Sequence, residues 1–286
     1  MSKFIKAGNR QIDLSVPVCM GILNATPDSF SDGAQLKRDS SHHFTVDINK
    51  ALHLADSMVS DGAVILDVGG ESTRPGAAAV SVQEELDRVI PVIEALSAKV
   101  DVCLSVDTSK PEVMTAAIDA GAGLVNDIRS LANAGALEVV NDRQVAVCLM
   151  HMQGTPGSMQ ENYQYSDVVS EVFDCLKKEI EICVNAGVSR DKILVDPGFG
   201  FGKSVEHNYL LLKNLASFKA LGQPILVGIS RKSMIGKVIG KPADQRLAGT
   251  IAATVYALRA GANIIRTHDV AATMDAIKVN LQIDRV

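Results

Sequence analysis

Polar or charged residues stand at or just after the end of eight short apolar runs in this chain of 286 residues. In chain order they are Asn24, Glu71 and Thr73, Asp107, Asn126 and Asp127, His151, Asp196, Lys232, and Arg266 and His268. Their carboxylates, amides and cations can together bind a polar ring and an anion. If the apolar runs are parallel strands that close into a barrel, residues at their carboxyl ends converge on one mouth. The sequence therefore predicts a binding site built from residues far apart in the chain.

Three of these residues, Asp107, Asn126 and Asp196, suit a flat heterocycle with several N–H groups along one edge. Carboxylates accept hydrogen bonds from ring N–H and amino groups, and an amide can both donate and accept. Lys232 could donate to a carbonyl oxygen of the same ring. Taken singly, Asp107 and Asn126 could instead cap a helix or a turn. Their convergence with Asp196 at one barrel mouth favours ligand binding.

Arg266 and His268 predict an anion site at the end of the last apolar run. They stand two residues apart, so they point to the same side of an extended chain. The helix expected next, DVAATMDAIKV, adds the free N–H groups and the positive dipole end of its N-terminus. An isolated His268 could instead cap this helix or make an ordinary surface contact. The sequence holds no HxxxH or Cys/His cluster with the spacing of a metal site made by protein ligands alone.

The segment GFGFGKS, from Gly198 to Ser204, is a near match to a phosphate-binding loop. Such a loop needs Gly five residues before its Gly-Lys pair, and Pro197 stands at that position. Proline has a fixed φ and no N–H, which spoils the phosphate cradle. We therefore exclude an ATPase of this type. Instead, we expect these glycines to let the backbone pass close to a flat ligand held by Asp196.

The eight apolar runs alternate with helical stretches, which predicts a (β/α)8 TIM barrel formed by a single domain over residues 1–286. The runs are apolar without alternation, as expected of a parallel sheet covered on both faces. A doubly wound sheet is the alternative, but NATPDSF follows the first run where a GxGxxG turn would bind a dinucleotide. Residues 3–14 alternate on either side of a turn-like tetrad at 7–10 and predict a hairpin that plugs the barrel floor.

Apolar residues spaced at i, i+3 and i+4 predict helices that pack on the outside of the barrel. The expected ranges are 46–62, 83–97, 111–121, 169–187, 205–218, 246–261 and 269–279. Two segments after the first and second apolar runs, TPDSFSDGAQLKRDSS and STRPGAAAVS, have no such period and are long for βα connections. We expect them to form two long mobile loops that act as lids, with hinges at Gly33 and Gly76.

Composition excludes several other classes of function. A net charge of -5, a pI near 5.7 and the lack of a basic run argue against a nucleic-acid-binding surface. The first residues, MSKFIKAGNRQIDL, lack the apolar stretch of a signal peptide, and no uninterrupted apolar segment is long enough to span a membrane. The five cysteines, Cys19, Cys103, Cys148, Cys175 and Cys183, include no CxxC pair and are expected to be reduced core thiols. We therefore expect a soluble cytoplasmic protein.

Eight segments resemble, in order and in spacing, the motifs of bacterial dihydropteroate synthases. They are GILNATPDSFSDGA, DVGGESTRPGA, SVDTSKPEV, VNDI, MHMQGTP, DPGFGFGK, GISRKSMIG and RTHDV, and the resemblance runs from residue 18 to residue 275. It implies a TIM-barrel enzyme that joins 6-hydroxymethyl-7,8-dihydropterin pyrophosphate to p-aminobenzoate, releasing pyrophosphate and forming 7,8-dihydropteroate for folate synthesis. It also implies a sulfonamide target, a homodimer and a requirement for Mg²⁺.

The resemblance further implies roles for individual residues. The pterin would be bound by Asp107, Asn126, Met150, Asp196, Lys232 and Arg266. The pyrophosphate would be held by Asn24, Thr73, Arg266 and His268, with Asn24 also a ligand of the Mg²⁺. The p-aminobenzoate and sulfonamide site would consist of Phe30, Arg74, Pro75, Phe201, Lys232 and Ser233. Catalysis would depend on Asp32, Arg74, Lys232, Arg266 and His268. Mild departures from the family are Ala25 where Val is usual, Ala34 in place of a Gly, and Gly157 where Arg is common.

These residues include no Ser/His/Asp triad and no activated cysteine, so we expect no covalent enzyme intermediate. The resemblance implies an SN1-like reaction, in which an anion leaves and a cation develops on the pterin. One alternative is a methyltransferase that passes a methyl group from a folate to a corrinoid protein, but it needs no pyrophosphate site such as Arg266 and His268. The other is a pterin-binding paralogue without catalysis, which the intact Asn24, Asp32 and Arg74 disfavour.

Overall fold

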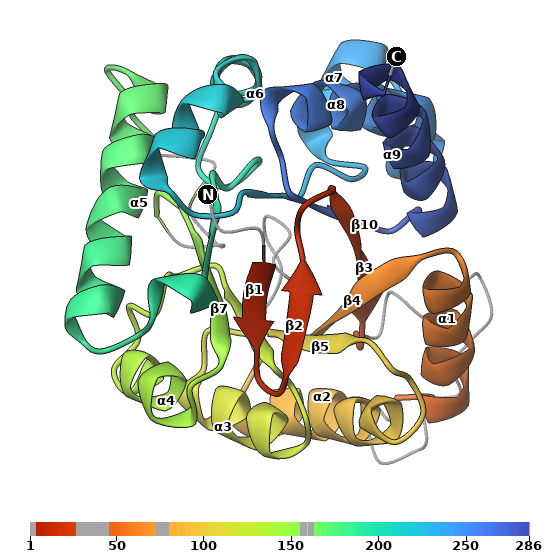
Figure 1. The fold of residues 1–286 in the computed structure, drawn as a ribbon, viewed down its shortest axis with the longest axis vertical. Coiled ribbons are helices and arrows are strands. Elements are labelled where there is room, and N and C mark those ends of the chain that lie inside the picture. The colour runs from red at the N-terminus through yellow and green to blue at the C-terminus, as the bar shows by residue number, and fades with distance from the viewer. Residues whose placement is uncertain (1–3, 27–45, 73–79, 155–158, 160–162, 286) are drawn as a thin grey trace.

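A closed ring of eight parallel strands forms the centre of the computed structural model, which describes residues 4–26, 46–72, 80–154, 159 and 163–285 (Figure 1). The strands are β3 (Val18–Asn24), β4 (Ala63–Gly69), β5 (Cys103–Asp107), β6 (Leu124–Asp127), β7 (Ala146–Met150), β8 (Ile193–Asp196), β9 (Leu226–Val227) and β10 (Ile264–Thr267). They pair in the order β8-β7-β6-β5-β4-β3-β10-β9, and a parallel bridge between Val195 and Ile225 closes the ring. The predicted (β/α)8 barrel is confirmed.

Helices surround the ring and cover its outer face, as Figure 1 shows. They are α1 (Ile48–Ser60), α2 (Val82–Ser97), α3 (Pro111–Asp119), α4 (Ala136–Arg143), α5 (Val168–Asn185), α6 (Val205–Lys213), α7 (Ser233–Ile239), α8 (Leu247–Ala260) and α9 (Val270–Asp284), with 3-10 turns η1 (Arg190–Lys192), η2 (Leu215–Leu221) and η3 (Ala243–Gln245). Asp47, Ser81 and Asp167 begin helices by accepting backbone N–H groups, which satisfies donors that the first turn leaves free. In the part of the chain that the structure describes, none of the helices combines the length and hydropathy needed to cross a bilayer.

The N-terminal hairpin, β1 (Phe4–Ala7) and β2 (Arg10–Asp13), lies across the ring at the end where the strands begin (Figure 1). Its residues Ile5 and Ile12 are buried in one apolar cluster with strand residues such as Met20, Ile65 and Leu124. The fit is close, because a side chain at Gly123 would come within 2.6 Å of the Ala7 carbonyl oxygen. The hairpin therefore plugs the floor, as the sequence predicts.

Strand β9 is shorter than the apolar run ILVGIS predicts. It ends at Val227, and Arg231 adopts a positive φ of 57°, with its Nε donating to Asp269 Oδ2 at 2.9 Å. The chain turns there, and Lys232 becomes the N-cap residue of α7. Lys232 thus reaches the mouth from the start of a helix rather than from the end of a strand.

Helix α6 also ends earlier than predicted. It stops at Lys213 instead of continuing to Phe218, and the 3-10 turn η2 follows. Asn214 Nδ2 donates to the Leu210 carbonyl oxygen at 2.9 Å, and Ser217 Oγ donates to the Asn214 carbonyl oxygen at 2.8 Å. Such local side-chain bonds compete with helical backbone pairing, which explains the early end.

Candidate active site

Arg266, on β10, lies between two carboxylates at the carboxyl-end mouth of the barrel. Its Nε donates to Asp67 Oδ2 at 2.6 Å, and its Nη2 donates to Asp107 Oδ2 at 2.6 Å. These carboxylates come from β4 and β5, so one planar guanidinium connects three strands. Asp107 is therefore not a helix cap, and the N-cap of α3 is Lys110.

Burial sets the protonation behaviour of this cluster. Burial raises the pKa of Asp107 to about 7; Arg266 lowers it and Asp67 raises it further. For Arg266, burial lowers the pKa, but Asp67 and Asp107 outweigh this and raise it above the usual value. The guanidinium thus stays charged, while the Asp107 carboxyl can exchange a proton near neutral pH.

Asp67 is a site residue that the sequence analysis did not predict. It is fully buried, and its two oxygens accept hydrogen bonds from Ser105 Oγ at 2.6 Å and Asn126 Nδ2 at 3.0 Å, besides the bond from Arg266. Asp67 therefore orients both Arg266 and the Asn126 amide. The available signal was a charged residue inside the apolar run VILDVGG, because a buried carboxylate in a strand needs a cationic partner.

Asp196 and Lys232 form the second polar group of the mouth. Asp196 ends β8 with 5% of its surface exposed, and its Oδ1 accepts the Gly198 N–H at 2.7 Å. Lys232 Nζ donates to the Phe199 carbonyl oxygen and lies 4.5 Å from the centre of the Phe201 ring. Burial raises the pKa of Asp196, with Lys232 opposing the shift. Burial lowers the pKa of Lys232 to about 8, again against the effect of Asp196.

An apolar patch lies beside these polar groups. The predicted residues Met150 and Phe201 are buried in one cluster with Met159, and Ile128 and Met152 pack against it. Met159, Ile128 and Met152 were not predicted from the sequence. Flexible methionine side chains suit the surface of a flat ring, because they adapt to its shape.

The predicted anion residues lie at the β10 side of the mouth. His268 Nδ1 is 3.0 Å from Ser230 Oγ, and the His268 N–H donates to the same hydroxyl at 3.2 Å. Helix α9 begins two residues later, as predicted. Asn24 ends β3 with a half-buried side chain, and Ser233 is exposed at the first position of α7. The Nε and Nη2 of Arg266 donate to the carboxylates of Asp67 and Asp107.

Five predicted site residues lie outside the described residues: Phe30, Asp32, Thr73, Arg74 and Pro75. The same holds for Gly33, Ala34, Gly76 and Gly157, and for nearly all of the two expected loops. The described residues that flank 73–79 are joined, because the Val80 N–H donates to Glu71 Oε1 at 3.1 Å.

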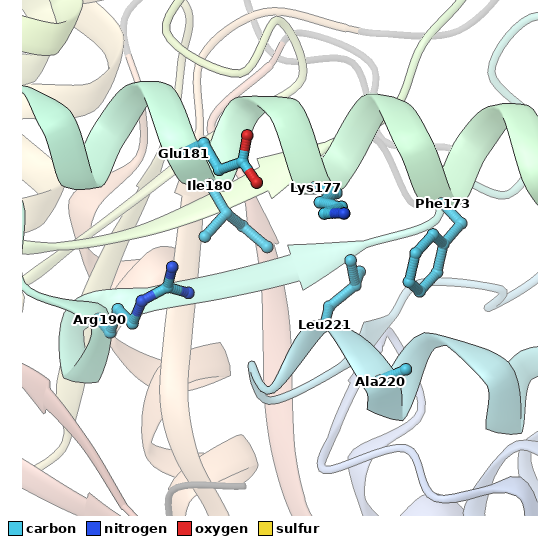
Figure 2. A pocket seen from close by; sticks show the side chains of 7 residues that line it. All are labelled: Phe173, Lys177, Ile180, Glu181, Arg190, Ala220 and Leu221. Atoms are coloured by element: carbon cyan, nitrogen blue, oxygen red, sulfur yellow. The ribbon is translucent and has the colours of Figure 1, made fainter.

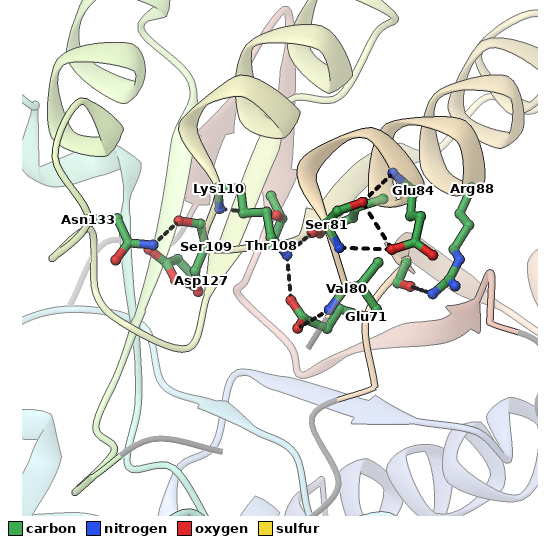
Figure 3. Close-up of polar contacts among 12 residues, drawn as sticks. Glu71, Val80, Ser81, Glu84, Arg88, Thr108, Ser109, Lys110, Asp127 and Asn133 are labelled. Carbon is green, nitrogen blue, oxygen red and sulfur yellow. Dashed lines mark hydrogen bonds and ion pairs between the residues drawn. The ribbon is translucent and has the colours of Figure 1, made fainter. Parts of the chain in front are cut away.

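Figure 3 shows a polar network that holds the ends of β4, β5 and β6. Lys110 Nζ pairs with Glu71 Oε2 at 2.6 Å and with the fully buried Glu85. Asp127 accepts hydrogen bonds from Ser109 Oγ and from the backbone N–H groups of Arg129 and Leu131. Glu71 and Asp127, which also follow apolar runs, therefore have structural partners.

A groove of about 180 Å³ lies on another part of the molecule, between α5 and the end of η2. Figure 2 shows the residues that line it, among them Phe173, Glu181 and Arg190. Arg190 and Leu221 come just before β8 and β9, so this end of the groove is at the floor side of the barrel. It contains none of the predicted site residues.

Comparison with known proteins defines the class to which this fold and site belong. Residues 20–268 match the family described as pterin binding enzyme. The chain is 51% identical to the dihydropteroate synthase of Escherichia coli (strain K12) over 96% of its own length and 94% of that protein. It is 51% identical to the dihydropteroate synthase of Haemophilus influenzae, with 96% of each chain covered. The chain thus belongs to the pterin-binding enzymes and, within them, to the dihydropteroate synthase family.

Solved structures agree with this assignment. The Yersinia pestis dihydropteroate synthase in a sulfonamide drug complex superimposes with a TM-score of 0.92 at 49% identity, covering 99% of this chain and 100% of that one. The Xanthomonas albilineans dihydropteroate synthase in complex with 7,8-dihydropteroate gives a TM-score of 0.88 at 43% identity, with 99% of each chain covered. The predicted fold, family and enzyme class are confirmed.

Proposed function

We propose that the mouth of this barrel condenses 6-hydroxymethyl-7,8-dihydropterin pyrophosphate with p-aminobenzoate, giving 7,8-dihydropteroate and pyrophosphate in tetrahydrofolate biosynthesis. The observation that carries this proposal is the convergence of Asp107, Asn126, Asp196, Lys232 and Arg266 at one mouth. Related enzymes have been solved with 4-aminobenzoic acid and with 7,8-dihydropteroate, which fits the same pair of small molecules.

In this proposal the pterin lies between the two polar groups. Asp196 accepts hydrogen bonds from ring N–H and amino donors, and Lys232 donates to the ring carbonyl oxygen. Asn126 adds an amide whose orientation is fixed by Asp67. The patch of Met150 and Phe201 covers an apolar surface of the ring.

The bond between the pterin methylene carbon and the pyrophosphate oxygen breaks first, and pyrophosphate takes the electron pair. Positive charge then spreads over the pterinylmethyl group, and the buried carboxylates of Asp67, Asp107 and Asp196 stabilise it. The amino nitrogen of p-aminobenzoate attacks the methylene carbon and loses its surplus proton to water. Arg266 and His268 hold the leaving pyrophosphate, His268 being placed for this at the start of α9.

The residues at the mouth are compatible with Mg²⁺ bound together with pyrophosphate. Mg²⁺ prefers oxygen ligands and keeps several of its waters, and the Asn24 amide supplies such an oxygen at the end of β3. Across residues 4–26, 46–72, 80–154, 159 and 163–285 there is no cluster of three or more His, Cys, Asp or Glu that could hold a metal by itself. When bound, the ion would neutralise charge on the leaving pyrophosphate. Among the described residues we therefore assign Asn24 as a ligand of this ion.

The remaining roles follow the family resemblance. Phe30, Asp32, Arg74 and Pro75, together with Phe201, Lys232 and Ser233, form the proposed aryl site, and Thr73 contacts the pyrophosphate. In support, Phe201 and Lys232 already lie together. A sulfonamide that mimics p-aminobenzoate would occupy the same site.

We also propose that the chain forms a homodimer through α7, α8 and α9. Large apolar side chains are exposed on these helices: Val238, Ile239, Leu247, Val255, Tyr256, Val279 and Ile283. Leu247 and Val255, and likewise Val279 and Ile283, are spaced to share a helix face, and α8 packs directly on α9. A second copy of the chain would cover this surface.

We also propose that the protein is located in the cytoplasm, because its five cysteines are free and four of them are buried.

The decisive experiment is a turnover assay with the purified protein, both substrates and Mg²⁺. We expect 7,8-dihydropteroate and pyrophosphate in equal amounts, and loss of turnover without unfolding when a chelator is added. Binding of the pterin without product would favour a non-catalytic paralogue. Transfer of a methyl group from methyltetrahydrofolate to a corrinoid would favour the methyltransferase alternative.

A further inference from the structure

The glycine-rich segment 197–203 packs against backbone at the end of β7. Gly198, Gly200 and Gly202 all have positive φ, at 72°, 85° and 59°. A Cβ at Gly198 would lie 1.8 Å from the His151 carbonyl oxygen, and one at Gly202 would lie 2.3 Å from the Gln153 carbonyl oxygen. Two of these glycines are thus required by the approach of two backbone segments, a reason that the sequence alone did not reveal.

Lys203 holds these two segments together from the inside. Its side chain is almost completely buried, with 3% of the residue's surface exposed. Its Nζ donates to the carbonyl oxygens of Gly198 at 2.8 Å, Phe201 at 3.0 Å and His151 at 3.2 Å. It also lies 2.9 Å from His151 Nδ1. A buried ammonium is costly unless its donors are satisfied, and here every donor has an acceptor.

The charge states of this pair follow from its surroundings. Burial and the Lys203 charge lower the pKa of His151 to about 3, so the imidazole is neutral and its Nδ1 can accept from Lys203. Burial lowers the pKa of Lys203 to about 7; Asp196 and Cys175 raise it, and Lys232 lowers it. The charge of Lys203 therefore interacts favourably with the carboxylate of Asp196, to which it is also connected through segment 197–203.

The segment that Lys203 anchors contacts both ligand-binding groups. The Gly198 N–H donates to Asp196 Oδ1 at 2.7 Å, and the Phe199 carbonyl oxygen accepts from Lys232. The Phe201 ring lies under Lys232 Nζ. Lys203 donates to the carbonyl oxygens of Gly198 and Phe201. In the sequence these two residues stand on either side of Phe199, whose carbonyl oxygen binds Lys232. A change in the shape of this segment would move contacts of Asp196 and Lys232 together.

Two outer side chains complete the support of the segment. Tyr165 Oη donates to the Gly202 carbonyl oxygen at 2.8 Å, and Asn208 Oδ1 accepts the Gly200 N–H at 2.6 Å. Both hydrogen bonds are neutral, and the one from Tyr165 is at the far end of the segment from Asp196. Removal of the Tyr165 hydroxyl should therefore disturb segment 197–203 less than removal of the Lys203 ammonium.

We propose that Lys203 is a positioning residue for pterin binding: its buried ammonium fixes segment 197–203 in the shape that presents the Gly198 N–H to Asp196 and the Phe199 carbonyl to Lys232. Lys203 itself touches neither substrate. The inference rests on the proposed function and adds a determinant of its pterin subsite. The cluster of Asp67, Asp107 and Arg266 does not contact Lys203, so the bond-breaking step should depend on it much less than binding does.

The test compares Lys203→Met with Lys213→Met, which removes an exposed lysine from α6. Steady-state kinetics are measured below the unfolding temperature of each variant, together with calorimetry of the dihydropterin substrate. For Lys203→Met we expect a pterin KM raised by about tenfold or more with kcat within about threefold of wild type. Lys213→Met should match wild type. A purely structural lysine would lower the unfolding temperature and leave KM unchanged, and that result would overturn the proposal.

If Lys203→Met does not fold, Tyr165→Phe takes its place, because it removes only the bond to the Gly202 carbonyl. We expect a pterin KM raised by about two- to fivefold, the effect of one neutral hydrogen bond. Wild-type affinity in Tyr165→Phe would then refute control of the pterin subsite by this segment. The wild-type arm separates the two proposals: a wild-type protein that neither binds pterin pyrophosphate nor turns over contradicts the proposed function, whereas an active wild type with unaffected variants contradicts only the role of Lys203.

Discussion

The floor and the mouth of this barrel are made by the same eight strands with opposite side-chain chemistry. At the floor, Met20, Ile65 and Leu124 pack under the hairpin residues Ile5 and Ile12 in a purely apolar cluster. At the mouth, the strand ends and the start of α7 carry buried carboxylates and cations, and burial shifts the pKa values of Asp107, Asp196 and Lys232. The floor lowers the free energy of the fold, whereas the mouth holds charges that are costly to bury and useful only with a ligand. Substitutions at the two ends should therefore affect different quantities.

The largest expected effect is on catalysis, from Arg266→Lys at the mouth. Lysine keeps the positive charge but cannot bridge Asp67 and Asp107 with a planar fork. We expect kcat/KM to fall by about a thousandfold, or about 4 kcal/mol, with a much smaller loss of stability. Steady-state kinetics and denaturant unfolding measure the two quantities. Arg259→Lys, at an exposed pair with Asp284, is the control, and equal activity of both variants would contradict the assignment of Arg266.

The converse effect is expected at the floor, from Leu124→Ala. Leu124 is fully buried between the hairpin and the strand starts, so its truncation leaves a cavity. We expect a loss of about 2–5 kcal/mol in the free energy of unfolding, with the pterin KM unchanged. The matched control is Leu54→Ala on α1, where the leucine is 41% exposed. A changed KM in Leu124→Ala would show that floor and mouth are coupled.

Asp196→Ala tests binding at the mouth separately from chemistry. The carboxylate is proposed to accept charge-assisted hydrogen bonds from the pterin, each worth about 1.5–3 kcal/mol, so pterin affinity should fall by about tenfold or more. Calorimetry without p-aminobenzoate measures this directly. Asp119→Ala, at a surface pair with Arg143, should bind like wild type. Wild-type affinity in Asp196→Ala would refute the pterin subsite.

The sequence predicted what depends on local pattern, and it missed what depends on tertiary contact. Apolar runs and helical spacing located seven strands well, and the polar residues at strand ends brought Asp107, Asn126 and Asp196 to one mouth. Asp67 escaped because it lies inside an apolar run and gains its partner from β10, about 200 residues later. The role of Lys203 was also not predicted, because its acceptors lie on His151, about 50 residues earlier, and on its own loop. The short β9 depends on Arg231 finding Asp269, which no local pattern reveals.

At physiological pH the effect expected from the titration of Lys232 is small, but the pH dependence that it produces also separates the two ends of the barrel. Burial lowers the pKa of Lys232 to about 8, with Asp196 and Asp107 raising it and Arg266 lowering it. The charge-assisted hydrogen bond to the pterin carbonyl requires the protonated amine of Lys232. The value of kcat/KM for the pterin should therefore decline above about pH 8, approaching tenfold per pH unit. The measurement is the pH profile of kcat/KM in wild type and in Lys232→Arg, which stays charged and should lose the part of the decline that begins near pH 8. Any part that begins near pH 7 would belong to Lys203.

Unfolding cannot explain such a decline through Lys232, because its effect on stability has the opposite sign. The folded-state pKa of about 8 lies below the usual value of 10.5, so between these two pH values the unfolded chain binds more protons at this residue than the folded protein does. The contribution of Lys232 to stability therefore increases with pH across this window while activity falls. Lys203 shares the lowered pKa, so the profile of Lys203→Met must keep the decline if Lys232 causes it. A decline that disappears in Lys203→Met and persists in Lys232→Arg would transfer the titration to Lys203.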